Sequence, residues 1–236
     1  MLPGTRESVR PVEPVPGLVT LHVWRIPRAK VPAALARMAL DRRRAQRTAG
    51  VSFAKMLGTG KGFTFGSTDA TRWAKLAVWS APGNDPVAAS WSRLAEETLR
   101  VELRPLISTG RWSGREPFGH PGHHGYAGPV AALTRARLVP HRAATFWRAV
   151  PDVAAGLHEA PGLTAAFALG EAPLALQGTF SVWDSTAALT AFAYEGAAHR
   201  QAIASTTEVG WYSESLFARF AVVGSDGTLD GKALLP

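Results

Sequence analysis

Hydrophobic and polar residues along the chain follow a pattern that occurs twice. Alternating apolar residues over Val19–Pro27 predict a strand ended by proline, and Ala131–Pro140 predicts the same, with the two prolines 113 residues apart. Each strand is followed by helical periodicity, from Val31 to about Arg44 and from Arg142 to about His158. A strand and a helix in the same order at one offset indicate an internal repeat.

Two further strand patterns recur at nearly the same offset. Gly50–Gly58 matches Gly162–Gly170, which begins 112 residues later, and both are apolar segments bounded by glycine. Trp73–Trp79 matches Gly178–Trp183, and their terminal Val-Trp pairs lie 104 residues apart. The order of these landmarks is the same in both halves, which chance similarity does not explain.

Each Val-Trp pair leads through a polar turn into a second helix and a last strand. In the first half we expect a helix over Ser90–Leu99 and a strand over Leu103–Thr109, and in the second half a last strand over Ser215–Val223. Each half therefore reads β-α-β-β-α-β, the ferredoxin-like pattern. The predicted fold class is α+β, with two tandem ferredoxin-like repeats packed sheet to sheet into a barrel, because each open sheet needs cover on its bare face.

The repeat also predicts the organisation of the chain. We expect a flexible N-terminal arm at residues 1–18, a first ferredoxin-like half at 19–109, a linker rich in Gly, Pro and His at 110–129, a second half at 130–223, and a C-terminal tail at 224–236.

Composition and charge narrow the classes of function. Hydrophobic residues make up 46% of the chain and cysteine is absent, which excludes disulfides and thiolate chemistry. We expect no transmembrane segment and no secretory signal, and hence a cytoplasmic protein. Residues 1–115 carry a charge of +11 and residues 116–236 a charge of −3, with an arginine-rich run at Asp41–Arg47. This run fits a solvated helix end, an acidic redox partner or peripheral contact with a membrane; no motif beside it favours nucleic acid.

Most catalytic signatures are absent from the sequence. The segment Gly58–Gly62 is rich in glycine but lacks the spacing of a phosphate-binding loop, so we expect a loop between two strands. Three histidines at His120, His123 and His124 offer metal ligands, but they stand in a Gly/Pro loop without a carboxylate or cysteine partner. A surface loop is the simpler interpretation of that cluster.

His199 is the histidine whose surroundings suggest a function. It follows Trp183 and a helical segment, and its neighbours Ala198, Ala202 and Ile203 are apolar. A neutral imidazole in apolar surroundings suits the proximal side of a haem iron, although a structural histidine at a helix start has the same pattern. The first repeat has no histidine at the equivalent place, so a single haem per chain follows if His199 is the ligand.

Several segments carry a resemblance to a known family. The order of landmarks resembles the dimeric α/β-barrel superfamily, and the Ala-Ala-His pattern ending at His199 resembles its haem-degrading monooxygenases. Nearly the whole chain is similar to the spheroidene monooxygenase family. The segments that carry this similarity are Leu57–Thr64, Gly110–Gly114, Gly128–Ala136, Phe180–Trp183 and Glu214–Phe220.

The resemblance implies a function and assigns roles to residues. Members of the family are haem-containing, O2-dependent ketolases of acyclic carotenoids, which implies haem b with His199 as its iron ligand, a hydrophobic substrate, and an electron donor such as ferredoxin. Lys55 and Arg111 become candidates for contacts with the distal pocket or the haem propionates. Trp183, Phe192 and Trp211 become candidates for the lining of the cofactor pocket. The chain is expected to act as a monomer or a homodimer.

Other functions of this barrel type remain open at this stage. A haem enzyme of the peroxidase or dehydratase type, a cofactor-free monooxygenase and a small-molecule binding module share the scaffold. Lys55 and Arg111 are equally typical of surface ion pairs, and aromatic residues at these spacings are common in a plain core. The arginine-rich run and the histidine-rich linker are local departures that leave the substrate undetermined.

Overall fold

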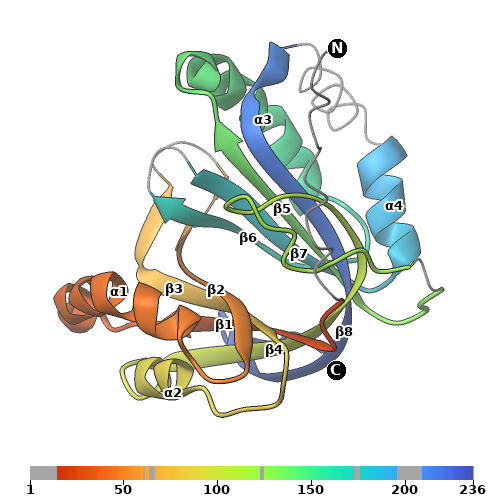
Figure 1. Cartoon of the computed structure of the whole chain (residues 1–236). Helices are drawn as coiled ribbons and strands as arrows, with labels where there is room; N and C mark the ends of the chain where they lie inside the picture. Colours follow the sequence, from red (N-terminus) through yellow and green to blue (C-terminus); the bar gives the residue numbers. More distant parts are fainter. Residues whose placement is uncertain are drawn as a thin grey trace, which may run out of the picture.

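The computed structural model describes residues 15–60, 62–63, 67–122, 125–172, 176–195 and 209–235, without the side chains of 149–155, 172, 176–177 and 195. It consists of a closed antiparallel barrel with helices on the outside (Figure 1). The first half contains β1 (Leu18–Arg25), a 3-10 turn (Arg28–Lys30), α1 (Val31–Gln46), β2 (Val51–Gly60), β3 (Thr68–Trp79), α2 (Pro86–Ser92) and β4 (Glu97–Gly110). The second half contains β5 (Val130–Leu138), a 3-10 turn (Pro140–Arg142), α3 (Ala143–His158), β6 (Leu163–Ala172), β7 (Leu176–Trp183), α4 (Thr186–Glu195), β8 (Tyr212–Leu229) and β9 (Lys232–Ala233).

The two halves have the same strand order. In the first half β1 lies between β4 and β3, with β2 outermost, and in the second half β5 lies between β8 and β7, with β6 outermost. The registers correspond as well, because Leu18 pairs with Trp79 in the first half and Val130 pairs with Trp183 in the second. The predicted repeat of two ferredoxin-like units is therefore confirmed.

Two seams close the barrel, and they differ in length. β4 and β8 run antiparallel from the pair Leu99–Gly227 to the pair Gly110–Leu216. The other seam joins β2 to β6 through only three paired positions, which begin at Gly58 and Gly170. Each half-sheet thus gains a partner at both edges, and no edge of the eight barrel strands is left unpaired along its whole length.

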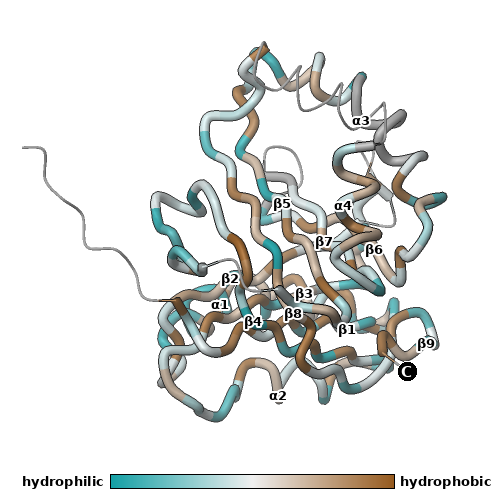
Figure 2. Tube along the Cα trace, turned by 90° about the vertical axis from the view of Figure 1, so that its right-hand side faces the viewer, coloured by the Kyte–Doolittle hydropathy of each residue, from teal (hydrophilic) through white to brown (hydrophobic). Residues whose placement is uncertain are grey.

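The interior of the barrel is a packed apolar core. Alternate residues of every barrel strand point inward, as the two-residue period of a strand requires. Figure 2 shows hydrophobic segments along the central strands. The largest inward side chains come from both halves: Leu21, Phe53, Leu57, Leu76, Leu103, Leu133, Phe167, Phe180, Leu216 and Phe220. Burial of this shared core is the main force that holds the two halves together.

One predicted helix is wrong in its position. The helix expected over Ser90–Leu99 lies earlier, at Pro86–Ser92, and β4 already begins at Glu97. The side chain of Asp85 accepts a hydrogen bond from the backbone of Ala88 at 2.9 Å and caps the helix, with proline at its first position. Leu99 and the alternate residues after it are buried in the barrel, so strand pairing prevails over helical propensity there.

The predicted linker and tail contribute to the barrel. Trp112 and Phe118, between β4 and β5, are fully buried in the core and cover one mouth of the barrel. The chain can turn from β4 into this segment because Gly110 has φ +84°, and a Cβ there would lie 2.2 Å from the carbonyl oxygen of Ser215. From residue 224 onward the chain continues β8 to Leu229 and returns as β9.

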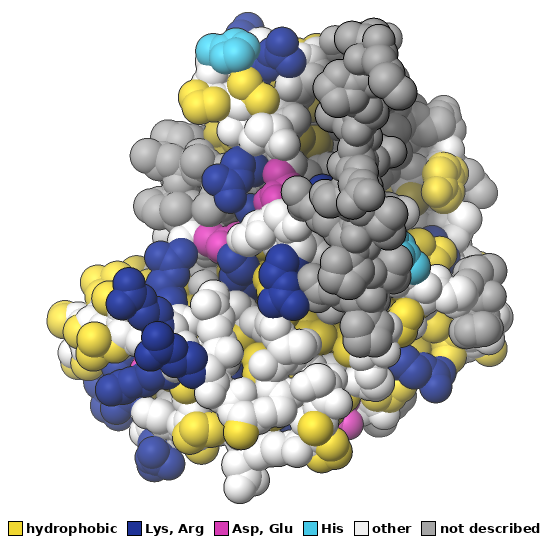
Figure 3. All heavy atoms as spheres, in the orientation of Figure 1, with side chains coloured by type: hydrophobic (Ala, Val, Ile, Leu, Met, Phe, Trp, Pro, Cys, Tyr) yellow, Lys and Arg dark blue, Asp and Glu magenta, His cyan; other side chains and the backbone are white. Residues whose placement is uncertain are grey.

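The arginine-rich run lies on the outside of α1. Arg42, Arg43, Arg44 and Arg47 are exposed, and Figure 3 shows Lys and Arg side chains gathered over this helix. A role in binding an acidic electron donor stays a prediction. Within the described ranges, every helix is too short or too polar to span a bilayer.

Candidate active-site face of the second half-sheet

The interior of the barrel leaves almost no room for a ligand. The cavity between Leu57, Leu133 and Leu169 has a volume of about 10 Å³, which is about the space of one water. One mouth is closed by the buried Trp112, whose Nε1 donates a hydrogen bond to Glu171 at 2.5 Å. A ligand larger than a water molecule does not fit in this cavity.

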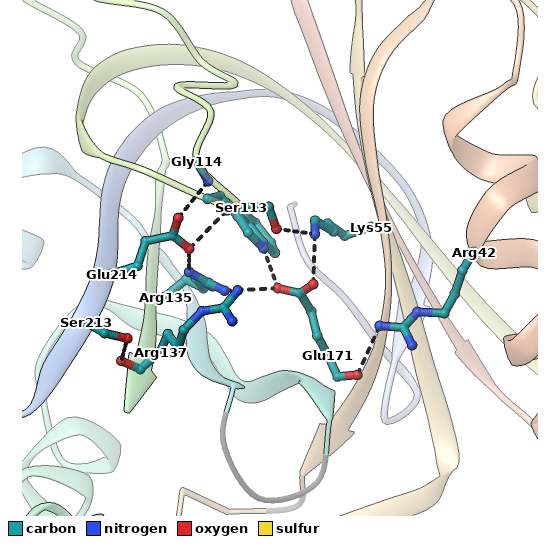
Figure 4. A network of polar contacts seen from close by, with 10 residues as sticks. Arg42, Lys55, Ser113, Gly114, Arg135, Arg137, Glu171, Ser213 and Glu214 are labelled. Carbon is teal, nitrogen blue, oxygen red and sulfur yellow. Dashed lines mark hydrogen bonds and ion pairs between the residues drawn. The ribbon is translucent and has the colours of Figure 1, made fainter. Parts of the chain in front are cut away.

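A charged network lies at this mouth (Figure 4). Lys55 Nζ lies 2.8 Å from Glu171 Oε2 and 2.7 Å from Ser113 Oγ. Arg135 bridges the carboxylates of Glu171 and Glu214. The network joins β2 of the first half to β5, β6 and β8 of the second half and to the linker, so it fixes the two halves at one end of the barrel.

The carboxylates in this network are held in their charged form. Burial acts to raise the pKa of Glu171, but hydrogen bonds from Lys55 and Trp112 and the charge of Arg135 outweigh it and lower the pKa below its usual value. Burial acts on Glu214 in the same way and is outweighed by the backbone N–H groups of Gly114 and Ser113 and by Arg135. The two positive charges are thus matched by two carboxylates.

These contacts place the two predicted catalytic cations. Lys55 points inward from β2 and is satisfied by Glu171 and Ser113, on the opposite side of the sheet from Trp183. Arg111 is exposed and its Nε lies 3.2 Å from Glu116 Oε1. The structure does not bring either cation to the aromatic residues predicted to line the cofactor pocket, and a catalytic role for Lys55 or Arg111 stays a prediction.

The outer face of the first half-sheet is filled by large side chains. His22 pairs with Lys75 and Trp24 pairs with Trp73 across β1 and β3, and Met56 lies beside Lys75 on β2. All five are buried under α1 and α2. Several of their polar atoms have partners that belong to the fold: for example, Lys75 Nζ binds both carboxylate oxygens of Asp85 at 2.5 Å. His22 Nδ1, in contrast, is buried without a hydrogen-bond partner among the described residues.

Four of the five equivalent positions in the second half-sheet carry small side chains, and the fifth, that of Trp73, is Gln177. By register, Thr134 replaces His22, Ala136 replaces Trp24, Thr179 replaces Lys75 and Ala168 replaces Met56. Together with Ala132, Ala166 and Ser181, these residues form what we term the C-terminal outer face. Thr134, near its centre, is exposed, whereas its counterpart in the first half is buried.

Aromatic residues stand at the two ends of the C-terminal outer face. At one end Trp183 is fully buried, with its ring 5.2 Å from that of Phe192 on α4. At the other end Trp211 lies 5.7 Å from the ring of Phe146 on α3 and donates a hydrogen bond to Thr145. The two ends lie roughly 27 Å apart, from the rise of about 3.4 Å per residue along β5.

Two of the three predicted pocket aromatics are therefore brought together, and the third is separate. Trp183 and Phe192 form one wall with α4, and Trp211 belongs to the opposite wall with α3. Between these walls Thr134 is exposed, whereas Ala132, Ala136 and Ser181 are buried. A role in cofactor binding for these aromatic residues stays a prediction.

Arg219 is a functional candidate that the sequence reasoning did not identify. It lies on the outer side of β8 and pairs with Ala132, in one row with Ser181 and Ala166 of the C-terminal outer face. Only 8% of it is exposed, and its Nε is buried without a hydrogen-bond partner among the described residues. A charged residue in the apolar sequence Phe217–Phe220 was the available signal.

The histidines give a partial view of a metal site. His199 lies outside the described residues, as do His123 and His124. His120 pairs with Glu116 at 2.9 Å, and the ring of His158 contacts Phe63. Within the described segments, no group of three His, Asp or Glu residues is arranged to hold a metal ion. A haem iron needs a single protein imidazole, and a face of small residues with a buried cation that has no partner among the described residues fits an apolar cofactor that carries carboxylates.

Comparison with other proteins relates most of the chain to one enzyme family. No family model matches the sequence. The chain is 36% identical over 216 residues to the spheroidene monooxygenase of Rhodobacter capsulatus, with 86% of this chain and 89% of that protein covered. It is 38% identical over 192 residues to the spheroidene monooxygenase of Rubrivivax gelatinosus, with 78% of this chain and 73% of that protein covered.

Solved structures show the same fold at low sequence identity. The structure of aldoxime dehydratase in complex with butyraldoxime has a TM-score of 0.56 and 13% identity, and the likeness covers 87% of this chain and 79% of that one. A second aldoxime dehydratase structure has a TM-score of 0.53, also at 13% identity, and covers 87% of this chain and 80% of the other. At this level of identity the likeness extends to the fold alone.

Proposed function

This chain belongs to the spheroidene monooxygenase family, and from that premise we propose that it is a haem-dependent monooxygenase that inserts oxygen from O2 into an apolar substrate of the carotenoid type. The observation that carries the proposal is the 36% identity to the Rhodobacter capsulatus enzyme over most of both chains. The named activity of that relative supports an oxidoreductase. The haem, the substrate and the use of O2 are the parts that we propose.

The difference between the two outer faces supports a location for the cofactor. We place the haem against the C-terminal outer face, between the wall formed by Trp183 and Phe192 and the wall formed by Trp211. Small side chains such as Ala168 and Thr134 leave depth for a ring there, whereas Met56 and Trp24 fill the equivalent positions of the first half. An apolar surrounding also excludes water, which protects reactive oxygen chemistry from side reactions.

His199 is the proposed iron ligand. It follows α4 in the sequence, four residues after Glu195, and α4 carries Leu189 and Phe192 on the side that packs against this face. A bound haem supplies oxygen activation with electrons from a donor such as ferredoxin, and the chain supplies ligation, orientation and the exclusion of water. An extended apolar substrate gains binding energy from the same aromatic walls.

The test is the haem content of the purified protein and of its histidine variants. Wild-type protein, purified or reconstituted with haemin, should show a Soret band at one haem per chain. His199→Ala should lose most of the haem or hold it loosely, because the imidazole is the main covalent anchor of the iron. In His199→Gly, added imidazole should restore part of the spectrum, because it can enter the space that the side chain leaves.

Matched controls separate ligation from general damage. His158→Ala and the triple change of His120, His123 and His124 to alanine should keep haem content and spectrum, since none of them is the proposed ligand. A colourless wild-type protein that cannot be reconstituted would overturn haem dependence. Full haem with an unaltered Soret band in His199→Ala would instead move the ligand to another histidine.

A further inference from the structure

Arg219 is largely buried at the outer surface of the barrel, and among the described residues its charge has no partner. Three described arginines have a buried Nε that makes no hydrogen bond: Arg72, Arg135 and Arg219. The first two still pair with carboxylates through their terminal nitrogens, Arg72 with Asp230 and Arg135 with Glu171 and Glu214. Arg219 takes part in none of the ion pairs or side-chain hydrogen bonds found among the described residues.

The cost of this arrangement indicates a missing partner. A guanidinium stays protonated at any accessible pH, so Arg219 cannot escape burial by losing its charge. A buried charge without a partner destabilises a fold, and apolar residues of similar size in its place often stabilise it. The neighbours of Arg219 on β8, Phe217 and Ala221, belong to the apolar cluster of Trp183 and Leu189, which provides no compensating charge.

The position of Arg219 indicates where the partner binds. It pairs with Ala132 of β5, in one row with Ser181 and Ala166, so small side chains lie beside it on that side, while Ile107 of β4 pairs with it on the other. In the first half the equivalent residue by register is Glu102, which pairs with Arg100. The first half therefore satisfies this position from within the chain, whereas the second half leaves a cation that faces the proposed cofactor side.

We propose that Arg219 binds an anionic oxygen group at the C-terminal outer face, and that this group comes from a ligand. In its haem form the proposal rests on the proposed function. Two sources share the required chemistry: a propionate of the bound cofactor, and a small anion held between the cofactor and the sheet. A guanidinium is suited to either, because its planar set of donors matches oxygen anions and its charge strengthens the hydrogen bonds.

The first arm of the test uses haem-free protein and does not depend on the proposed function. Arg219→Met should unfold at the same temperature as wild type or higher, because it removes an uncompensated charge and keeps the length of the side chain. Hexanoate, which joins a carboxylate to an apolar tail, should raise the unfolding temperature of wild type and not of Arg219→Met. Arg137→Met, which removes an exposed arginine from the neighbouring strand β5, should respond to hexanoate as wild type does.

The second arm distinguishes the two sources in reconstituted protein. If a propionate is bound, the dissociation constant of haemin should rise at least about tenfold in Arg219→Met, while that of haemin dimethyl ester stays the same. If a small anion is bound, haemin affinity should stay the same and the dissociation constant of fluoride for the ferric protein should rise about tenfold. Arg219→Lys should recover part of either loss, because it restores the charge.

Each result decides the proposal. Loss of hexanoate, haemin or fluoride affinity in Arg219→Met but not in Arg137→Met supports it. Unchanged affinity for all three probes overturns it, and so does a fall of several degrees in the unfolding temperature of haem-free Arg219→Met, which would show that the arginine has a structural partner within the chain. A wild-type protein that binds no haemin would overturn the proposed function, and the haem-free arm would then decide on Arg219 alone.

Discussion

The two halves of the barrel have one topology and two different outer faces. Inside, their strands contribute similar apolar residues to a single core, as Leu21 and Leu133 do at equivalent positions. Outside, the first half places Trp24, Met56 and Lys75 under its helices, and the second half has alanine or threonine at the same register. The residues of the two inner faces constrain each other, because each face packs against the opposite half. The residues of an outer face pack only against the helices of their own half, so they can change independently.

The connections after the second helix of each half differ in the same direction. Four residues separate α2 from β4, whereas sixteen separate α4 from β8, and His199 is among the sixteen. The outer face of the first half thus contributes to stability, and the second half has both smaller side chains on its outer face and a longer connection after its second helix. We infer that the repeat diverged into a half that supports the fold and a half that carries the site.

The largest expected effect is the loss of a large side chain from the first outer face. Trp24→Ala should lower the free energy of unfolding by about 3–5 kcal/mol, because a fully buried indole leaves a cavity. Thr134→Ala in the second half should change it by about 0.5 kcal/mol or less, as expected of an exposed residue. Equilibrium unfolding in urea measures both values; equal costs at the two sites would show that both faces are packed and would break the comparison.

A second expected effect concerns acid stability in the first half. Burial lowers the pKa of His22 to about 4. The charge of Asp85 acts to raise this pKa, and the charges of Lys75 and Arg100 act to lower it. The unfolded state therefore binds a proton at His22 near pH 6.5, whereas the folded state does not until the pH approaches 4. The contribution of His22 to stability is thus fully present above pH 6.5 and is lost as the pH falls towards 4. Between pH 7 and pH 4 wild type should lose about 3 kcal/mol more than His22→Gln.

The contribution of His22 is measured by the difference in the free energy of unfolding between wild type and His22→Gln, and not by the pH dependence of either protein alone. Carboxylates with lowered pKa values, such as Glu171, make both proteins less stable in acid. Urea unfolding of wild type and His22→Gln at matched pH values isolates the contribution of the histidine. Parallel pH profiles would mean that this outer face is open enough to solvate an imidazolium, contrary to the packing described.

The smallest expected effect on stability is that of Thr134→Trp, for which the effect on cofactor binding is the informative measurement. Thr134→Trp introduces a large side chain at the centre of the C-terminal outer face, where the residue is exposed. The free energy of unfolding of the haem-free protein should stay within about 0.5 kcal/mol of wild type, while the dissociation constant of haemin should rise at least about tenfold because the space is filled. Haemin titration followed at the Soret band measures this, and unchanged affinity would place the cofactor elsewhere.

The fold could be predicted from the sequence because the repeat is visible in local sequence patterns. The prolines after β1 and β5, the glycines that bound β2 and β6, and the Val-Trp endings of β3 and β7 identified six of the eight barrel strands with their order. The helix at Ser90–Leu99 was misplaced because helical periodicity in the sequence overlapped a strand whose pairing is non-local. The capping aspartate at residue 85 was the local signal that marked the true start.

The site was less accessible to sequence reasoning, for a physical reason. Trp183 and Phe192 could be grouped because they are close in the sequence, but Lys55 faces the barrel core, and the face on which a side chain lies depends on register. The small size of Thr134, Ala136 and Ala168 had no meaning until their counterparts were known from strand pairing. Arg219 lies in a segment that carries the family resemblance, and its lack of a partner among the described residues is visible only in three dimensions.

The long strand β8 has a consequence for how the protein is made. It pairs with β5 over Tyr212–Ala221 on one side and with β4 of the first half over Leu216–Gly227 on the other. Every other barrel strand precedes it, so during translation the barrel cannot close until this strand has left the ribosome. Arg219 lies on the same strand, so the outer face gains its charge only when closure is possible. The closing strand β8 and the proposed anion-binding residue Arg219 are thus synthesised together. A nascent chain therefore cannot form the complete proposed site while the barrel is still open.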